Sequence, residues 1–177
     1  MNNLREIVQL GNPVLRAKAQ PVTNVHLDSL QSLIDELITT LKPSNGVGIA
    51  APQIAESYRV FILASRPTLR YPQAPTMEAI AIIDPKIIAY SQEKVKDWEG
   101  CLSVPGIRGL VPRHQAIEVE YLDQQGTLHH EEFTGFVARI FQHEYDHLEG
   151  KVFLDRVESM LDIVTEQEYQ KQFLQQL

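Results

Sequence analysis

Residues 136–150, "FVARIFQHEYDHLEG", decide the fold, because they predict the helix around which the other elements are expected to pack. Ile140, His143 and His147 recur at steps of three and four, so they share one face of a helix. A glycine closes the stretch, as is common just after the last helical residue. The stretch therefore predicts a helix over 136–148 with two histidines on one face.

The same helix carries the metal-binding pattern H-E-x-x-H. His143 and His147 project the same way and can bind one ion, while Glu144 can reach a water molecule on that ion. This arrangement is typical of metal-assisted hydrolysis. A pattern this short also occurs in helices whose histidines only pack, so the third ligand decides the chemistry.

Three kinds of residue compete for that third position. Metzincins place a histidine where this chain has Phe153, which cannot bind a metal, so that class is excluded. A downstream carboxylate, Glu166 or Glu168, would make the chain a gluzincin-like metallopeptidase. Cys101, the single cysteine, would supply a thiolate and complete a His2Cys site with an open position. The residues alone leave the thiolate and the carboxylate as alternatives.

The rest of the chain predicts a mixture of helices and antiparallel strands. Apolar residues recur at helical spacing from Leu27 to Leu41, and Pro43 stops the pattern. A last helix is predicted over about 158–175. The "DQQG" stretch at 123–126 is typical of a hairpin connection. Short apolar or alternating segments predict strands at 59–65, 79–91, 116–123 and 128–135.

These elements indicate an α+β fold. We expect antiparallel β-sheets packed around a central metal-binding helix, with one helix near the N-terminus and one near the C-terminus. The 177 residues are the length of one ordinary domain. We therefore expect a single catalytic domain over 1–177, with the helix at about 158–175 as an appended element.

Composition places the chain among soluble globular proteins. A net charge of -7 argues against a surface built to hold nucleic acid, and no nucleic-acid motif is apparent. The start of the chain has neither a signal-peptide nor a transit-peptide pattern, and no apolar run is long enough for a membrane. A lone cysteine fits a reducing compartment. We expect a cytoplasmic location, or an organellar stroma or matrix if a transit peptide is missing.

Three motifs give the chain a family resemblance. The stretches "GVGIAAPQI" (46–54), "EGCLSVPG" (99–106) and "QHEYDHLEG" (142–150) resemble the three motifs of the peptide deformylases, in the same order. The similarity extends over about residues 5–157. Any one motif is weak, but the three together are highly specific.

The resemblance implies a metal site and a set of catalytic groups. By this resemblance Cys101, His143 and His147 are the metal ligands and Glu144 is the catalytic carboxylate. It also implies that Gln53, through its side-chain amide, and Leu102, through its backbone N–H, stabilise an oxyanion. The further residues implied for the substrate pocket, which takes methionine, are Gly46, Val47, Gly48, Phe136 and Ile140, with Arg108 near its entrance.

The activity implied by the family is removal of the formyl group from the N-terminal formyl-methionine of new polypeptides, with release of formate. Close backbone at the "GVG" stretch would leave room only for a small acyl group. The expected cofactor is one divalent ion, Fe(II) by resemblance, with Zn, Ni or Co as substitutes that suit the same ligands. The expected partners are N-formyl-methionyl nascent peptides, with transient contact to the ribosome.

Several residues keep more than one interpretation. Arg139 faces the expected site, and the sequence does not choose between packing, an ion pair and a pocket role. Glu99 and Arg113 are either partners that brace the cysteine loop or two solvated charges. A descendant without catalytic activity that keeps the metal is a third hypothesis. The remaining histidines, His26, His114, His129 and His130, are expected to have no metal role.

Overall fold

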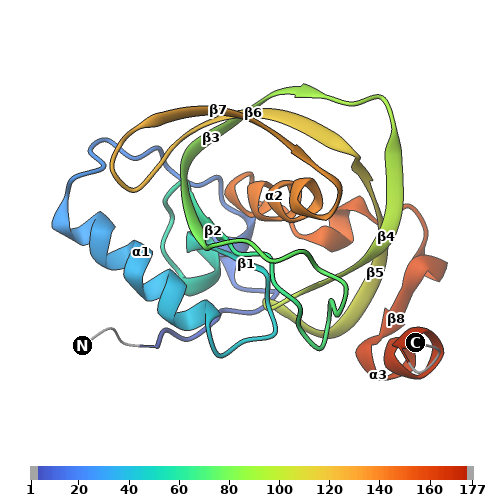
Figure 1. Ribbon diagram of the computed structural model, residues 1–177. Coiled ribbons are helices and arrows are strands. Elements are labelled where there is room, and N and C mark those ends of the chain that lie inside the picture. Colours follow the sequence, from blue (N-terminus) through green and yellow to red (C-terminus); the bar gives the residue numbers. More distant parts are fainter. Residues whose placement is uncertain (1–3, 175–177) are drawn as a thin grey trace.

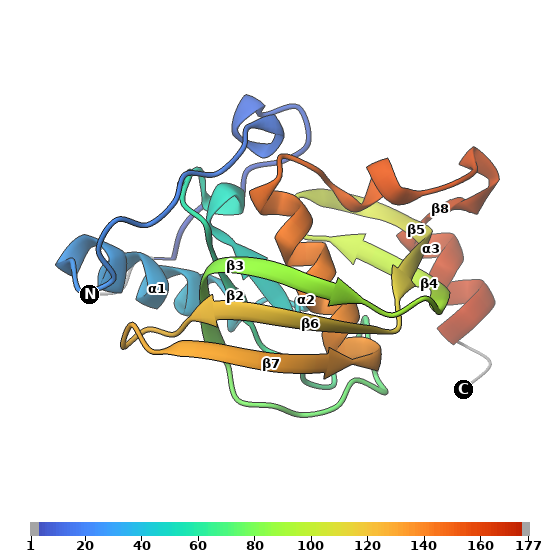
Figure 2. The same cartoon turned by 90° about the horizontal axis from the view of Figure 1, so that it is seen from above.

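The computed structural model describes residues 4–174 and confirms the α+β fold. Two antiparallel sheets form a strongly curved wall, and helix α2 (Gly135–Leu148) lies in the space that they enclose (Figure 1). A view from above shows α2 crossing behind the long strands of the larger sheet, with the smaller sheet beside it (Figure 2). The helix predicted over 136–148 is therefore the central element of the fold.

The larger sheet has five strands in the order β1-β2-β3-β6-β7. All of its neighbours pair antiparallel, and β3 contains register shifts that help it bend around the helix. Its strands confirm the segments predicted from the sequence and add a short strand inside the first glycine-rich motif. Their bounds are β1 (Gly48–Ala50), β2 (Val60–Leu63), β3 (Ile80–Tyr90), β6 (Ala116–Leu122) and β7 (Leu128–Thr134).

The smaller sheet contains β4 (Lys94–Cys101), β5 (Val104–His114) and β8 (Ile163–Thr165). The sequence analysis did not predict these strands, because the first half of β4 is charged and exposed and β5 contains prolines and glycines. Strands β4 and β5 form a hairpin whose register places Cys101 opposite Val104. The hairpin turn therefore fixes the position of the cysteine.

The N-terminal helix α1 (Asp28–Leu41) confirms the prediction for that segment. Ile34 and Leu37 of its apolar stripe are fully buried in one cluster with Ile49 of β1 and Ile62 of β2. Burial of each such side chain contributes roughly 2 kcal/mol. Helix α1 therefore supports β1 from behind, and β1 in turn borders the site described below.

The C-terminal helix is present, but the bounds predicted for it, about 158–175, were wrong. A 3₁₀ turn (Met160–Asp162) leads into β8, which pairs Arg108 with Val164, and only then does the chain turn into the short helix α3 (Glu166–Tyr169) and a π-helical turn. The β-branched residues of β8 find a free edge on β5, which outweighs their helical context. The last residue of the predicted range lies outside the described residues.

The core between α2 and the larger sheet is apolar. Ala138, Phe141 and Leu148 are fully buried, and the ring of Phe141 meets Phe61 edge-on at 5.1 Å. Within the described part of the chain, no helix is long and apolar enough to cross a membrane.

Candidate active site

The ligands expected from the sequence come together at one point. Cys101 ends β4, while His143 and His147 lie one turn apart on α2, and one donor atom from each lies within 4.8 Å of the others. The Cys101 Sγ atom is 3.3 Å from His147 Nε2. Two elements from different parts of the chain thus present three ligands to a single point.

The chemistry of these donors fits a divalent transition metal. Burial by itself would raise the pKa of the Cys101 thiol, but the imidazoles of His147 and His143 outweigh it and hold that pKa well below its ordinary value. A thiolate is the form that binds metals. One thiolate and two imidazoles, with no fourth protein ligand in the cluster among residues 4–174, match an open catalytic site better than a closed structural one.

Glu144 is the carboxylate closest to this cluster in sequence, and it is only 3% exposed. Its Oε2 atom has no hydrogen-bond partner among the described residues. Burial raises the pKa of Glu144 to about 7, although the two imidazoles act in the opposite direction. A carboxyl group with this pKa can both accept and donate a proton near neutral pH.

Close backbone approach holds Glu144 in place. A Cβ atom on Gly48 would lie 2.5 Å from Glu144 Oε1, so any larger residue at this position would displace the carboxylate. On Gly46 a Cβ atom would lie 3.0 Å from the side chain of Leu102. Gly48 is therefore required by space at the site, whereas a side chain at Gly46 would need the tip of Leu102 to shift by a few tenths of an ångström.

Gln53 lies on a 3₁₀ turn (Ala51–Ile54) directly behind the ligands. Its Oε1 atom accepts a hydrogen bond of 2.9 Å from the Ala50 backbone, which orients the amide. Its Nε2 atom then points to Cys101 Sγ at 3.4 Å and to Ser103 Oγ at 3.2 Å. The side chain is 1% exposed, so its amide N–H is held ready at the edge of the site.

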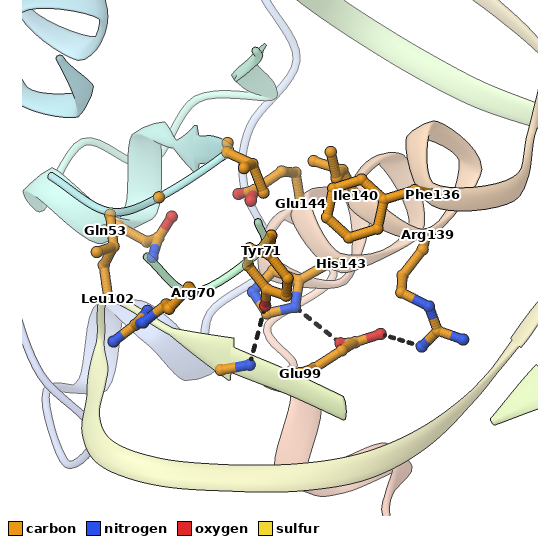
Figure 3. Close-up of a pocket in the computed structure, with 14 residues that line it drawn as sticks. Gln53, Arg70, Tyr71, Glu99, Leu102, Phe136, Arg139, Ile140, His143 and Glu144 are labelled. Carbon is orange, nitrogen blue, oxygen red and sulfur yellow. Dashed lines mark hydrogen bonds and ion pairs between the residues drawn. The ribbon is translucent and has the colours of Figure 1, made fainter. Parts of the chain in front are cut away.

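A buried ion-pair network orients His143. Glu99 accepts a hydrogen bond from His143 Nδ1 at 2.9 Å, from Arg113 at 2.9 and 3.0 Å and from Arg139 at 2.8 Å, as Figure 3 shows in part. Burial would raise the pKa of Glu99, but Arg113 and His143 hold it below its ordinary range. Carboxylates that bind the second ring nitrogen of a metal-ligating histidine fix its tautomer and orientation.

The network settles two questions that the sequence left open. Glu99 and Arg113 are paired and buried rather than solvated, and Arg139 forms an ion pair with Glu99 and also lines the pocket described next. From Arg113 the network continues to Asp146 at 2.6 Å and from there to Arg156 at 2.6 Å. The smaller sheet and α2 are therefore joined by charge rather than by apolar packing.

A pocket opens beside the ligands and encloses about 430 Å³, part of it open to solvent. It is lined by apolar residues from α2 and by the first two motifs, with Glu144 and His143 at its base (Figure 3). Of the residues expected from the sequence, those that line it are Gly46, Val47, Gly48, Gln53, Leu102, Phe136, Ile140, His143 and Glu144.

Comparison with known proteins assigns this architecture to a family. The sequence profile of the polypeptide deformylase family matches residues 4–162. The chain belongs to that family. Peptide deformylase 2 of Nostoc sp. is 64% identical over 168 residues, which cover 95% of this chain and 94% of that protein. Peptide deformylase 1 of Xanthomonas campestris is 40% identical, covering 88% of this chain and 91% of that one.

Solved deformylase structures have the same fold. The crystal structure of a class I type b peptide deformylase from Acinetobacter baumannii with Met-Ala-Ser bound is 43% identical, with a TM-score of 0.86. The match covers 89% of this chain and all of that one. A deformylase structure from Thermotoga maritima has a TM-score of 0.79 at 36% identity, covering 89% of this chain and 99% of that one.

Membership in the deformylase family confirms the enzyme class predicted from the three motifs. The chain is a metal-dependent hydrolase that removes the N-formyl group from new polypeptides. The gluzincin-like alternative is not favoured. Glu166 is bound by Arg108 at 2.7 Å and Glu168 by Lys171 at 2.7 Å, and neither belongs to the ligand cluster.

The structure places three residues of this deformylase differently from what the sequence analysis expected. Arg108 does not line the pocket, because its side chain is fully buried next to Glu166. Arg70 and Tyr71, which the sequence analysis did not single out, do line it. They lie in the proline-rich loop 64–79, and the only available signal was an aromatic and a basic residue side by side in a loop.

The other four histidines lie outside the ligand cluster. His129 Nε2, on β7, contacts Asp123 at 2.7 Å, and His114 Nδ1, at the end of β5, contacts the Ser91 carbonyl at 2.6 Å. His130 lies 3.6 Å from Glu120 and His26 near the β6–β7 turn.

Proposed function

We propose that Cys101, His143 and His147 hold the divalent ion of this deformylase and that Glu144 moves the proton during hydrolysis of the formyl amide. The observation that carries this proposal is the convergence of the three donor atoms within 4.8 Å beside a buried carboxylate. A divalent ion held there supplies Lewis acidity, which brings the pKa of water from 15.7 toward ~7. All other steps fall to side chains and backbone of the chain itself.

Glu144 is suited to act first as base and then as acid. With its pKa raised to about 7 by burial, it can take a proton from the attacking water and later give it to the departing amine. Its buried carboxylate lies against Gly48 beside the ligands, which favours proton transfer from a fixed position.

Gln53 and Leu102 are proposed to stabilise the negative charge that develops on the formyl oxygen. The Gln53 amide is oriented by Ala50, and Leu102 follows Cys101 directly in the hairpin turn between β4 and β5. One donor of this kind is typically worth ~3 kcal/mol of the barrier. Both residues line the pocket beside the ligands, which favours their acting on one oxygen.

The pocket supports selection of a small acyl group on methionine. Gly46 and Gly48 bring backbone close to the reacting group, and Val47, Phe136 and Ile140 give the pocket an apolar lining. The related Acinetobacter enzyme was solved with Met-Ala-Ser bound. We expect formyl-Met-Ala-Ser to be a substrate here and acetyl-Met-Ala-Ser to be rejected on size.

We infer Fe(II) as the physiological ion, with Zn, Ni or Co as functional substitutes, since one thiolate and two imidazoles suit all four. The partners that we propose are formylated nascent peptides, met in the cytoplasm or in an organellar stroma or matrix. Contact with the ribosome would be transient. Helix α3 carries Glu166 and Glu168, so such a contact would not rest on a basic C-terminal helix.

The test is formate release from formyl-Met-Ala-Ser by anaerobically prepared, Fe(II)-loaded protein. Cys101→Ala is expected to lose both metal and turnover, while Glu168→Gln serves as a surface control that keeps both. Release by Cys101→Ala at the wild-type rate would overturn the ligand assignment. Equal rates on the formyl and acetyl peptides would overturn the assignment of the glycine wall as the size filter.

A further inference from the structure

One wall of the substrate pocket comes from a loop with no regular structure. Tyr71 lies in the loop 64–79 and lines the pocket, where its ring packs on Phe136 at 5.1 Å. Its hydroxyl accepts a hydrogen bond of 3.2 Å from the backbone of Gly100, next to the ligand Cys101 (Figure 3). The orientation of Tyr71 therefore shapes the pocket at the point where the substrate side chain is expected.

The ring of Tyr71 also packs against a buried charged side chain, Arg108. The guanidinium of Arg108 lies 5.1 Å from the Tyr71 ring and 4.7 Å from the ring of Tyr169, so it is held between two aromatic residues. Its side chain is fully buried, and its Nη1 atom has no hydrogen-bond partner among the described residues. An apolar side chain would fill such a position at less desolvation cost.

The C-terminal segment supplies the counter-charge. Glu166 accepts hydrogen bonds from Arg108 Nε at 2.7 Å and from Nη2 at 3.2 Å, a bidentate pair. The same carboxylate lies 3.9 Å from Arg70, the neighbour of Tyr71 that also lines the pocket. Glu166 therefore interacts with the pocket loop directly, at Arg70, and indirectly, through Arg108, which packs on Tyr71.

The segment that carries Glu166 is anchored on the strand that carries Arg108. Strand β8 pairs Val164 with Arg108, and Thr165 caps α3 by accepting a hydrogen bond from Glu168. Figure 1 shows β8 and α3 lying along the outer end of β5. The end of the chain, the buried arginine and the pocket loop therefore form one connected unit.

We propose that Arg108, Glu166 and Tyr169 position Tyr71, so that the C-terminal segment sets how tightly the pocket binds the methionine end of the substrate. The inference rests on the proposed function, because it takes this pocket as the substrate pocket. None of the three residues touches the reacting atoms, so they act on substrate binding rather than on the chemical step.

The test compares Glu166→Gln with the matched control Glu168→Gln, whose carboxylate only meets Lys171 at the surface. Glu166→Gln is expected to raise KM for formyl-Met-Ala-Ser about 5-fold with kcat within about 2-fold of wild type, the scale of one cation–π contact. Glu168→Gln is expected to leave both parameters unchanged. Equal kinetics of the two variants would overturn the proposal.

A double-mutant cycle separates positioning of Tyr71 by Glu166 from a general loosening of the pocket. Because Glu166 is expected to act through Tyr71, the rise in KM from Glu166→Gln should largely disappear in a Tyr71→Ala background. Simple multiplication of the two effects would overturn the coupling. Arg108→Met removes the buried charge itself, so it avoids an unpaired arginine and should still raise KM in a well-folded protein.

A second readout keeps the inference separate from the proposed function. Calorimetric binding of the product peptide Met-Ala-Ser needs no turnover, and Glu166→Gln is expected to weaken it about 5-fold relative to Glu168→Gln. Absence of formate release by the wild type would overturn the proposed function, while this binding comparison would still decide the positioning role.

Discussion

The two sides of helix α2 are held by different forces. Toward the larger sheet, Phe141 and Leu148 are fully buried among apolar residues such as Phe61. Toward the smaller sheet, Arg113 joins Glu99 of β4 to Asp146 of α2 through ion pairs of 2.9 and 2.6 Å. Apolar contact is non-directional and secures the position of the helix. Charged hydrogen bonds are directional, and they set the rotation that aims the histidines.

The largest effect on activity is expected at Glu144, which takes part neither in the apolar packing of α2 nor in its ion pairs. Glu144→Gln keeps the shape of the side chain but removes the proton carrier, so kcat should fall about 10³-fold. Metal content and the free energy of unfolding should stay close to wild type, which stopped-flow assays, metal analysis and urea unfolding would establish. A rate within tenfold of wild type would remove Glu144 from the proposed mechanism.

One variant on each side of α2 tests whether apolar contacts and ion pairs have these different roles. Phe141→Ala leaves a cavity and should lower the free energy of unfolding by about 3–5 kcal/mol, with little change in metal affinity of the folded protein. Arg113→Met leaves Glu99 and Asp146 without their shared partner and should cost a similar 3–5 kcal/mol.

Only Arg113→Met is expected to weaken metal binding, about 10–100-fold, because Glu99, which orients His143, keeps Arg139 but loses its bidentate partner. Urea unfolding and competition with a metal chelator would measure the two quantities on the same preparations. Equal metal affinities in both variants would mean that the ion pairs support the fold alone.

A smaller effect is expected from Gly48→Ala on β1. The new Cβ atom would lie 2.5 Å from Glu144 Oε1 and should shift the carboxylate, lowering kcat about 10²-fold. Gly126→Ala is the control, because its φ of 81° makes alanine unfavourable in a turn remote from Glu144. It should cost roughly 1 kcal/mol of stability and no activity. A normal rate for Gly48→Ala would show that the site accommodates the extra methyl group.

The smallest effect is expected on the free energy of unfolding at low pH. Burial would raise the pKa of Asp146, but Arg156 and Arg113 lower it below its ordinary value, so its stabilising contribution is complete above the unfolded pKa of about 3.9 and is lost as pH falls through the lower folded pKa. Asp146→Asn should therefore flatten the decline in unfolding free energy below about pH 4, by about 1–3 kcal/mol. Urea titrations at several pH values measure this, and parallel curves would contradict it.

Much of the site was readable because its residues sit in short motifs. His143, Glu144 and His147 need only helical spacing to converge, and Cys101 stood out as a lone cysteine beside a glycine. The sequence left the ion pairs of Glu99 and Arg139 open among alternatives, since a charged residue is buried only when a distant partner arrives. Tyr71 was missed for the same reason, because a loop residue acquires its role from what packs behind it.

The fold divides in a similar way. Helices α1 and α2 and four strands of the larger sheet follow local periodicity, and the structure confirms them. The smaller sheet does not, because the first half of β4 is exposed and charged, and β8 exists only through pairing with the edge of β5.

By itself, the sequence determined the α+β class, the central helix and the family of this deformylase, since these depend on periodicity and on motifs a few residues long. Only the tertiary structure decided which charges are buried, how the C-terminal segment pairs and what stands behind the pocket wall. Those features depend on contacts between residues far apart in the chain, such as Arg108 with Glu166, whose energy no local pattern encodes.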